Sequence, residues 1–217
     1  MRNAPATRLI RSAADDQDLD AAAAIVAEAF SSLQATAWLV PEPDRRMIIL
    51  TDVFRILVRH ARDHGQVDLL VQMPKVGGAR GRHSIGAAVW FHRDHEIPPP
   101  ADYSHRLREA AGEYTSRFEI LDRLFNEHHP DQSHHHLALL AVVPNCQGKG
   151  AGSALLQHHH AGLVLQEMPA YLEASNLQSR DLYLDHGYRA HGQPFSLPNG
   201  ATFHPMWRTP SGIEDSR

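Results

Sequence analysis

A strand, a glycine-rich turn and a helix follow one another between Leu137 and Gln166, and this succession constrains the fold more than any other stretch. The apolar run LALLAVVP has the length of a buried strand and stops at Pro144. The segment SALLQHHHAGLVLQ carries apolar residues at helical spacing. Between them, NCQGKGAG places three glycines within five residues. We therefore predict an α/β fold in which a core strand turns directly into a helix.

The turn is suited to binding phosphate through its backbone. The first N–H groups of a helix lack internal partners, and the helix dipole adds partial positive charge at that end. Gly148, Gly150 and Gly152 leave room for ligand oxygens, and Lys149 adds a cation. The spacing fits neither a Walker A loop nor a Rossmann fingerprint. We expect a phosphate or pyrophosphate that is held mainly by backbone N–H groups.

Two linked motifs resemble the GNAT superfamily of acyl-CoA-dependent N-acyltransferases. The first is Q-x-x-G-x-G, formed by Gln147, Gly150 and Gly152 directly after the apolar strand. The second is LEASN followed by LYLDHGY, in which Asn176 and Tyr183 are seven residues apart. The resemblance implies a mixed, mostly antiparallel sheet that is flanked by helices and split after its central strand.

The resemblance is strong over residues 137–188 and looser elsewhere. We expect one domain over residues 1–217, with a helical insertion at 92–132 and a flexible tail at 209–217; its size and its 42% hydrophobic content suit a single globular core. The insertion makes the chain resemble the puromycin N-acetyltransferase-like branch of the superfamily. Local patterns predict a loop over 31–43, one long helix over 103–127, and a final strand pair over 190–197 and 201–208.

Composition limits the partners. A net charge of −4 argues against a nucleic-acid-binding surface and permits a cationic substrate. The single cysteine suits a reducing cytoplasm, and no apolar run is long enough to span a bilayer. Sheet edges of such folds commonly pair between copies, so a homodimer is the oligomer that the resemblance suggests.

The resemblance implies acetyl-CoA as the acyl donor and a primary amine of a small molecule as the acceptor, joined by direct attack in a ternary complex. The pantetheine arm of the donor would pair with the open edge of the strand that ends at Val142, whose N–H would face the thioester oxygen. Asn176 would bond the arm, cap the next helix, or do both. The implied donor-binding residues are Leu140, Ala141, Val142, Gln147, Gly148, Lys149, Gly150, Ala151, Gly152, Ser153 and Asn176.

Acyl transfer to an amine needs an uncharged nitrogen and a proton for the leaving thiolate. The resemblance gives Tyr183 the role of general acid, and a phenol keeps its proton at neutral pH. The alternative is a tyrosine that only packs in the core. Glu173 and His136 are the candidates for general base, with His136 six residues before Val142. Either could instead be structural, because chains of water molecules can deprotonate an amine.

Other interpretations stay open at this point. Cys146, beside the helix start, could carry the acyl group as a nucleophile. The fold could bind acyl-CoA as a sensor or scaffold without turnover, the acceptor could be a protein or peptide amine, and the acyl group could be longer than acetyl.

Histidine is abundant, with 17 copies and runs at His134–His136 and His158–His160. Neighbours on a strand point to opposite faces and neighbours on a helix fan around its axis. A single run therefore cannot surround one metal ion unless two elements meet. We expect no metal site.

Overall fold

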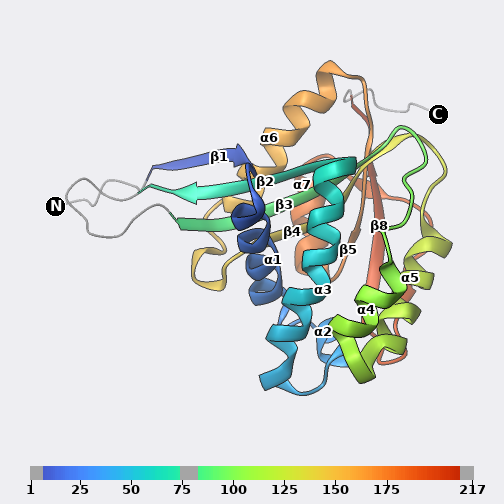
Figure 1. Cartoon of the computed structure of the whole chain (residues 1–217). Helices are drawn as coiled ribbons and strands as arrows, with labels where there is room; N and C mark the ends of the chain where they lie inside the picture. Colours follow the sequence, from blue (N-terminus) through green and yellow to red (C-terminus); the bar gives the residue numbers. More distant parts are fainter. Residues whose placement is uncertain (1–6, 74–82, 211–217) are drawn as a thin grey trace.

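The computed structural model describes residues 7–73 and 83–210. Residues 74–82, whose glycines and basic side chains predict a turn between two strands, and most of the expected tail lie outside the described residues. Eight strands form one mixed sheet in the order β1-β2-β3-β4-β5-β8-β6, with β7 paired to β8 (Figure 1). The strands are β1 Arg8–Ser12, β2 Gly65–Gln72, β3 His83–Arg93, β4 His134–Val142, β5 Ala170–Ala174, β6 Arg189–Ala190, β7 Phe195–Ser196 and β8 Thr202–Arg208. The helices are α1 Asp16–Phe30, α2 Gln34–Leu39, α3 Pro43–His64, α4 Tyr103–Ala111, α5 Thr115–His128, α6 Ala151–Leu165 and α7 Leu177–Asp185.

Helices cover both faces of the sheet. Helices α1 and α3 pack on one face, which we call the α1 face, whereas α6 and α7 pack on the other, the α6 face (Figure 1). Alternate residues of each strand feed one of two separate cores, since side chains alternate across a strand. In β3, for example, Val89 belongs to the core under α1 and Trp90 to the core under α6. The predicted α/β fold with a mostly antiparallel sheet is confirmed.

The sheet opens between β4 and β5. These strands run parallel and pair only at His135 with Ala170 and at His136 with Tyr171. Within the described residues the rest of β4 has no strand partner on that side, although its other edge stays paired with β3 up to Val142. The register between β3 and β4 shifts beside Trp90, which leaves Ala138 as the extra residue of a bulge. The predicted split after the central strand is therefore present.

Three local expectations were wrong. The stretch 31–43 contains the short helix α2, which the sequence pattern did not indicate. The insertion holds two helices instead of one, because the chain turns at Gly112 with a φ of 54°. The penultimate strand is interrupted between β6 and β7, where Gly192 has a φ of 72° and Pro194 follows. A proline has no N–H to donate to a strand neighbour, so the pairing with β8 resumes only afterwards.

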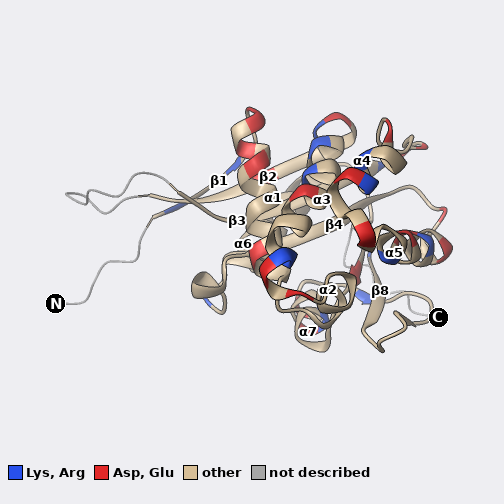
Figure 2. Ribbon diagram, turned by 60° about the horizontal axis from the view of Figure 1, so that its bottom comes forward, with Lys and Arg blue, Asp and Glu red and all other residues tan. Residues whose placement is uncertain are grey.

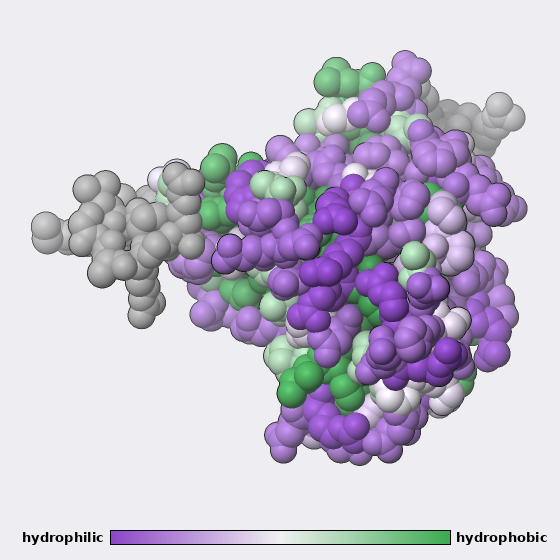
Figure 3. Space-filling view, in the orientation of Figure 1, coloured by the Kyte–Doolittle hydropathy of each residue, from purple (hydrophilic) through white to green (hydrophobic). Residues whose placement is uncertain are grey.

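Charged residues tie α1 to α3 and are spread over the helices. Arg55 of α3 bonds Asp20 of α1 at 2.9 Å, and Arg62 bonds Asp16 at the same distance. Figure 2 shows acidic and basic residues interspersed on these helices. The face seen in Figure 3 is mostly hydrophilic, in agreement with the burial of apolar residues in the two cores.

Gly65 sits where β2 begins, and its backbone lies against β3. A Cβ at this position would lie 1.9 Å from the carbonyl oxygen of Trp90. We predict that Gly65→Ala lowers the free energy of unfolding by about 3 kcal/mol, because one backbone must move away from the other. Denaturant unfolding of the full chain measures this.

Gly162→Ala is the matched control for that substitution. Gly162 lies inside α6, and the nearest atom to its added Cβ is 3.9 Å away. Alanine favours a helix interior over glycine by about 0.5–1 kcal/mol, so this variant should gain stability. Equal stability of Gly65→Ala and the unmodified chain would show that the strands can separate there at no cost.

Candidate active site

The turn between β4 and α6 has the backbone shape expected of an anion site. Gly148 and Gly150 have φ angles of 67° and 75°, values that side-chain-bearing residues rarely adopt. Gly150 is the N-cap of α6, and no side chain caps that end of the helix. The first amides of α6, at Ala151, Gly152 and Ser153, are thus left for a ligand.

Two long side chains brace this turn. Gln147 Nε2 donates to the carbonyl of Val142 at 2.8 Å, which joins the turn to the end of β4. Arg8, at the start of β1, donates to the carbonyl of Lys149 at 2.8 Å. Sequence reasoning missed Arg8, since nothing in the sequence shows that β1 reaches the turn. Its guanidinium adds a second cation beside Lys149.

The free edge of β4 offers its backbone to the split. Val143 N–H donates to the carbonyl of Ile85 on the β3 side at 2.9 Å. Successive N–H groups of a strand point to opposite edges, so the N–H of Val142 and that of Leu140 point into the split. This is the orientation that a pantetheine arm needs for strand-like pairing.

Helix α7 places Tyr183 beside the split on the α6 face. Its N-cap is Asn176, whose Oδ1 accepts the N–H of Ser179 at 2.8 Å. Asn176 therefore caps the helix, as one of its two expected roles requires. The side chain of Tyr183 is 8% exposed and its hydroxyl has no hydrogen-bond partner among the described residues. Burial raises the pKa of Tyr183, so the phenol holds its proton at physiological pH.

Glu173 and His136 meet on the α1 face, at the last paired position before the split. His136 Nε2 lies 3.0 Å from Glu173 Oε2, and the glutamate side chain is 5% exposed. Burial raises the pKa of Glu173, but the imidazoles of His136 and His129 more than offset it and hold the pKa at about 2. An ionised Glu173 accepts a hydrogen bond from the N–H at Nε2, which leaves the lone pair on Nδ1 of His136 free. That nitrogen is buried and has no partner within the described ranges.

Further side chains surround this pair. His129, just after α5, has Nδ1 at 3.9 Å from Glu173 Oε1, and its Nε2 lies 3.1 Å from Nε2 of His134. The ring of Tyr171 packs against those of His134 and His136, with ring centroids 5.5 and 5.6 Å apart. Sequence reasoning missed His129, His134 and Tyr171. The two histidines before Pro130 could have marked a functional site in the sequence. The position of His129 beside Glu173, however, depends on where the end of the insertion lies in the folded structure.

Cys146 lies in a short 3₁₀ turn at Pro144–Cys146 and is partly buried. No hydrogen bond joins its thiol to an imidazole or a carboxylate in the part of the chain that the structure describes. The geometry that would activate it as a nucleophile is therefore not formed there.

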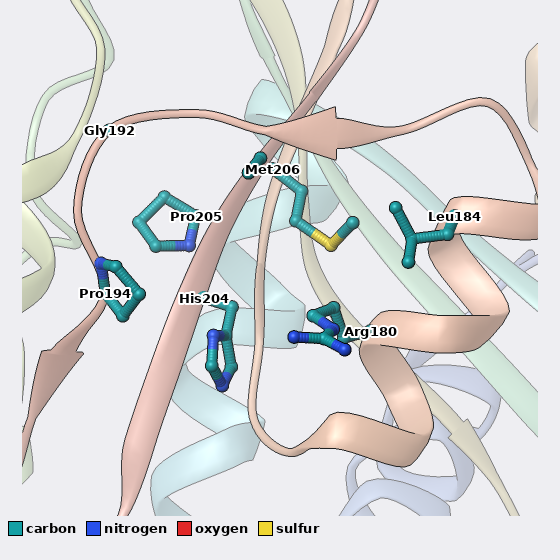
Figure 4. Close-up of a pocket in the computed structure, with 8 residues that line it drawn as sticks. Arg180, Leu184, Gly192, Pro194, His204, Pro205 and Met206 are labelled. Carbon is teal, nitrogen blue, oxygen red and sulfur yellow. The ribbon is translucent and has the colours of Figure 1, made fainter.

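A pocket of about 230 Å³ lies between α7 and the strands β6 and β8. Arg180 and His204 approach each other across it, with Met206 and Leu184 at its apolar end (Figure 4). It is on the α6 face, because Leu172 and Ala174 of the adjoining strand pack there, whereas the carboxylate of Glu173 points to the other side. The sheet thus separates this pocket from the pair formed by His136 and Glu173.

Comparison with known proteins agrees with this geometry. Residues 126–209 match the acetyltransferase (GNAT) domain family. The structure described as histone acetyltransferase HPA2 and related acetyltransferase from Corynebacterium glutamicum is 25% identical, with a TM-score of 0.68, over 94% of this chain and 97% of that one.

More distant structures share the fold. The structure described as mosquito arylalkylamine N-acetyltransferase like 5b is 14% identical over 94% of this chain and 100% of that one, with a TM-score of 0.58. Arylalkylamine N-acetyltransferase 2 from Aedes aegypti is 12% identical over 94% and 99% of the two chains, with a TM-score of 0.56.

These comparisons place the chain among proteins with the fold of GNAT acetyltransferases, and the family model itself covers residues 126–209. The family match begins at the end of the insertion and takes in every element from β4 to β8. None of the helices within residues 7–73 and 83–210 is long and apolar enough to cross a membrane.

The cap of α7 gives a structural test. We predict that Asn176→Ala lowers the free energy of unfolding by about 1 kcal/mol, because Ser179 N–H loses its acceptor. Asn176→Asp is the matched control, since a carboxylate caps equally well and favours a helix start. Denaturant unfolding compares the two, and an alanine variant as stable as the aspartate variant would contradict the role of the cap.

Proposed function

We propose that the protein transfers the acetyl group of acetyl-CoA to the primary amine of a small molecule by direct attack within a ternary complex. The observation that carries this proposal is the pair at the split: His136 is bonded to the ionised Glu173 through Nε2 at 3.0 Å and keeps Nδ1 free. Such a nitrogen is a general base whose tautomer is already fixed.

The two faces of the sheet divide the substrates. Acetyl-CoA lies on the α6 face, with its pyrophosphate on the turn around Gly150 and its pantetheine arm along Leu140–Val142. The amine approaches from the α1 face, where His136 and Glu173 lie. The two meet in the gap that β5 leaves open, which holds the reacting atoms together without a covalent enzyme intermediate.

The donor contacts follow from the free backbone groups. Val142 N–H polarises the thioester oxygen and stabilises the oxyanion that forms on attack. The amides at the start of α6 and Lys149 hold the pyrophosphate charge. Asn176, besides capping α7, reaches the arm with its amide nitrogen.

The proton transfers balance in three steps. His136 takes one proton from the ammonium group, and the free amine attacks the thioester carbon. The C–S bond breaks as the tetrahedral intermediate collapses, and Tyr183 gives its phenolic proton to the leaving sulfur. The second proton lost by the nitrogen returns to Tyr183 through solvent, and His136 releases the first proton to solvent.

The surroundings favour a small acceptor. His136 and His129 are only 14% and 13% exposed, so the pair lies deep below the surface. Aromatic side chains of α5, β7 and β8 close that side, with Phe125 in contact with Phe195 and Phe203. A buried carboxylate at the end of such a site attracts a cation, which an ammonium group supplies. A peptide lysine is the second candidate, in line with the name of the relative from Corynebacterium glutamicum.

Substitution of His136 and Glu173 tests their proposed role as general base. We predict that His136→Ala lowers kcat by about 100-fold or more and leaves acetyl-CoA binding unchanged, because only the amine loses its proton acceptor. Glu173→Gln should lower kcat as well, since an amide can donate to Nε2 and reverse the tautomer. His158→Ala, at an exposed histidine of α6, is the control. Unchanged turnover in both variants would remove the pair from the mechanism.

Removal of the hydroxyl oxygen of Tyr183 tests its proposed role as general acid. We predict that Tyr183→Phe lowers kcat by about 100-fold while acetyl-CoA binds as before, since the phenol acts only when sulfur leaves. Tyr188→Phe is the matched control: its ring is 5.7 Å from that of Tyr183 and its hydroxyl bonds the buried His160. That variant should lose stability and keep its kcat. An equal loss of kcat in both would point to packing instead of proton donation.

The acceptor class is found by measuring thiol release from acetyl-CoA with a panel of amines. The panel contains an arylalkylamine, a polyamine, an amino acid, puromycin and a lysine-bearing peptide. Turnover with a small amine supports the proposal, and turnover with the peptide alone selects the second candidate. Binding of acetyl-CoA without turnover across the panel would favour a sensor. A cytoplasmic location and a homodimer remain predictions.

A further inference from the structure

Each histidine run sends one ring to the same place on the α6 face, where a third ring from β3 joins them. His135 of β4 and His159 of α6 are 5% and 6% exposed, and Nδ1 of the first lies 2.9 Å from Nε2 of the second. The ring of His92 stacks on that of His135 with centroids 4.0 Å apart. One nitrogen of each ring lies within 4.8 Å of the others.

We propose that His92, His135 and His159 form a binding site for a divalent transition metal, with Zn²⁺ as the ion of choice. Three neutral imidazoles are a common ligand set for zinc, and water takes the fourth position. This proposal revises the expectation of no metal. The condition that two elements must meet is fulfilled by β4 and α6, with β3 as a third.

The charge state of the rings suits a metal. Burial lowers the pKa of His135 to about 4 and that of His159 to about 2, and it lowers the pKa of His92 as well. The rings are therefore neutral at physiological pH, which is the form that binds metal. One of the two rings in the 2.9 Å contact carries the shared proton. That proton moves to the outer nitrogen of the ring when the ion enters, so charge is conserved.

The geometry needs only small ring movements. Zinc–nitrogen bonds of about 2.0–2.1 Å in a tetrahedron place ligand nitrogens about 3.3 Å apart, slightly more than the contact between His135 and His159. His159 is held by stacking on Trp90 at 3.9 Å. His92 is half-buried, and its Nε2 has no hydrogen-bond partner among the described residues, so no hydrogen bond competes with an ion for that nitrogen.

An exposed carboxylate lies near the three histidines, and one of the three belongs to the helix of the anion site. Burial lowers the pKa of His92 and His135, and the negative charge of the exposed Asp94 opposes that lowering; the same charge attracts a cation to the site. A bound ion would join the second half of α6 to β3 and β4. The first turn of that helix is the anion site, so the metal would fix the helix that holds the acyl donor.

A second group, His129, His136 and Glu173, also has ligand atoms within 4.8 Å of one another. There the hydrogen bond of 3.0 Å from His136 to Glu173 requires the proton on the nitrogen that a metal would need. In the three-histidine site the contact of 2.9 Å also holds a proton, but it lies between two neutral imidazoles and not against an ionised carboxylate, and for that reason we assign the metal to that site. Substitutions in each group distinguish the two candidate metal sites.

The test uses the full chain, purified without a histidine tag and stripped with a chelator. Zn²⁺ is titrated by calorimetry and Co²⁺ by its visible absorption, which reports tetrahedral nitrogen ligands. We expect one ion per chain, a rise in melting temperature with Zn²⁺, and a loss of affinity of about 100-fold or more in His92→Ala and His159→Gln. His158→Ala and His136→Gln are controls that should bind as the unmodified chain does.

Several outcomes would overturn the assignment. They are the absence of saturable binding, unchanged affinity in His92→Ala and His159→Gln, and a loss confined to His136→Gln, which would move the ion to the other group. If circular dichroism shows that His159→Gln does not fold, His92→Ala decides, because that ring is at the margin of the core. Metal binding is read directly here, so the result does not depend on acetyl transfer.

Discussion

Everything at the site depends on the brief pairing of β4 with β5. Two residue pairs hold these strands together, and beyond His136 no other strand of the described chain pairs with that edge of β4. Unpaired N–H and C=O groups inside a fold are costly unless a partner is supplied. Gln147 supplies one by bonding the carbonyl of Val142, and a ligand that pairs like a strand is the natural partner for the rest.

The same gap joins the two faces of the sheet. Tyr183 belongs to the core under α6, whereas Glu173 alternates to the α1 face, so a continuous sheet would keep the proposed acid and base apart. In the proposed mechanism, the split lets each of them act on one reactant of a single step. The parallel arrangement of β4 and β5 is what permits this, because both strands then diverge from one common end.

Sequence reasoning predicted the fold and the backbone geometry of the glycine-rich turn, because local chemistry determines them. The glycines at 148 and 150 indicate their own positive φ angles, and Asn176 indicates a helix cap from its neighbours alone. The acceptor side was harder, since it is assembled from distant segments. His129 comes from the end of the insertion, and the tertiary path of α4 and α5 cannot be calculated from their periodicity. Helix α2 was missed for a similar reason: its six residues are stabilised by packing and not by a repeated pattern.

The histidine run on β4 shows how one strand can serve two purposes. Because side chains alternate, His134 and His136 face the α1 side of the sheet while His135 faces α6. Each environment suits a different proposed role: beside the ionised Glu173 an imidazole has its tautomer fixed, as a base requires, whereas an imidazole among other neutral imidazoles suits a metal ligand. Burial lowers the pKa of His135, whereas a hydrogen bond to Glu173 fixes the tautomer of His136, although the two residues are adjacent in the chain. The face of the sheet, and not the residue type, therefore decides what each histidine can do.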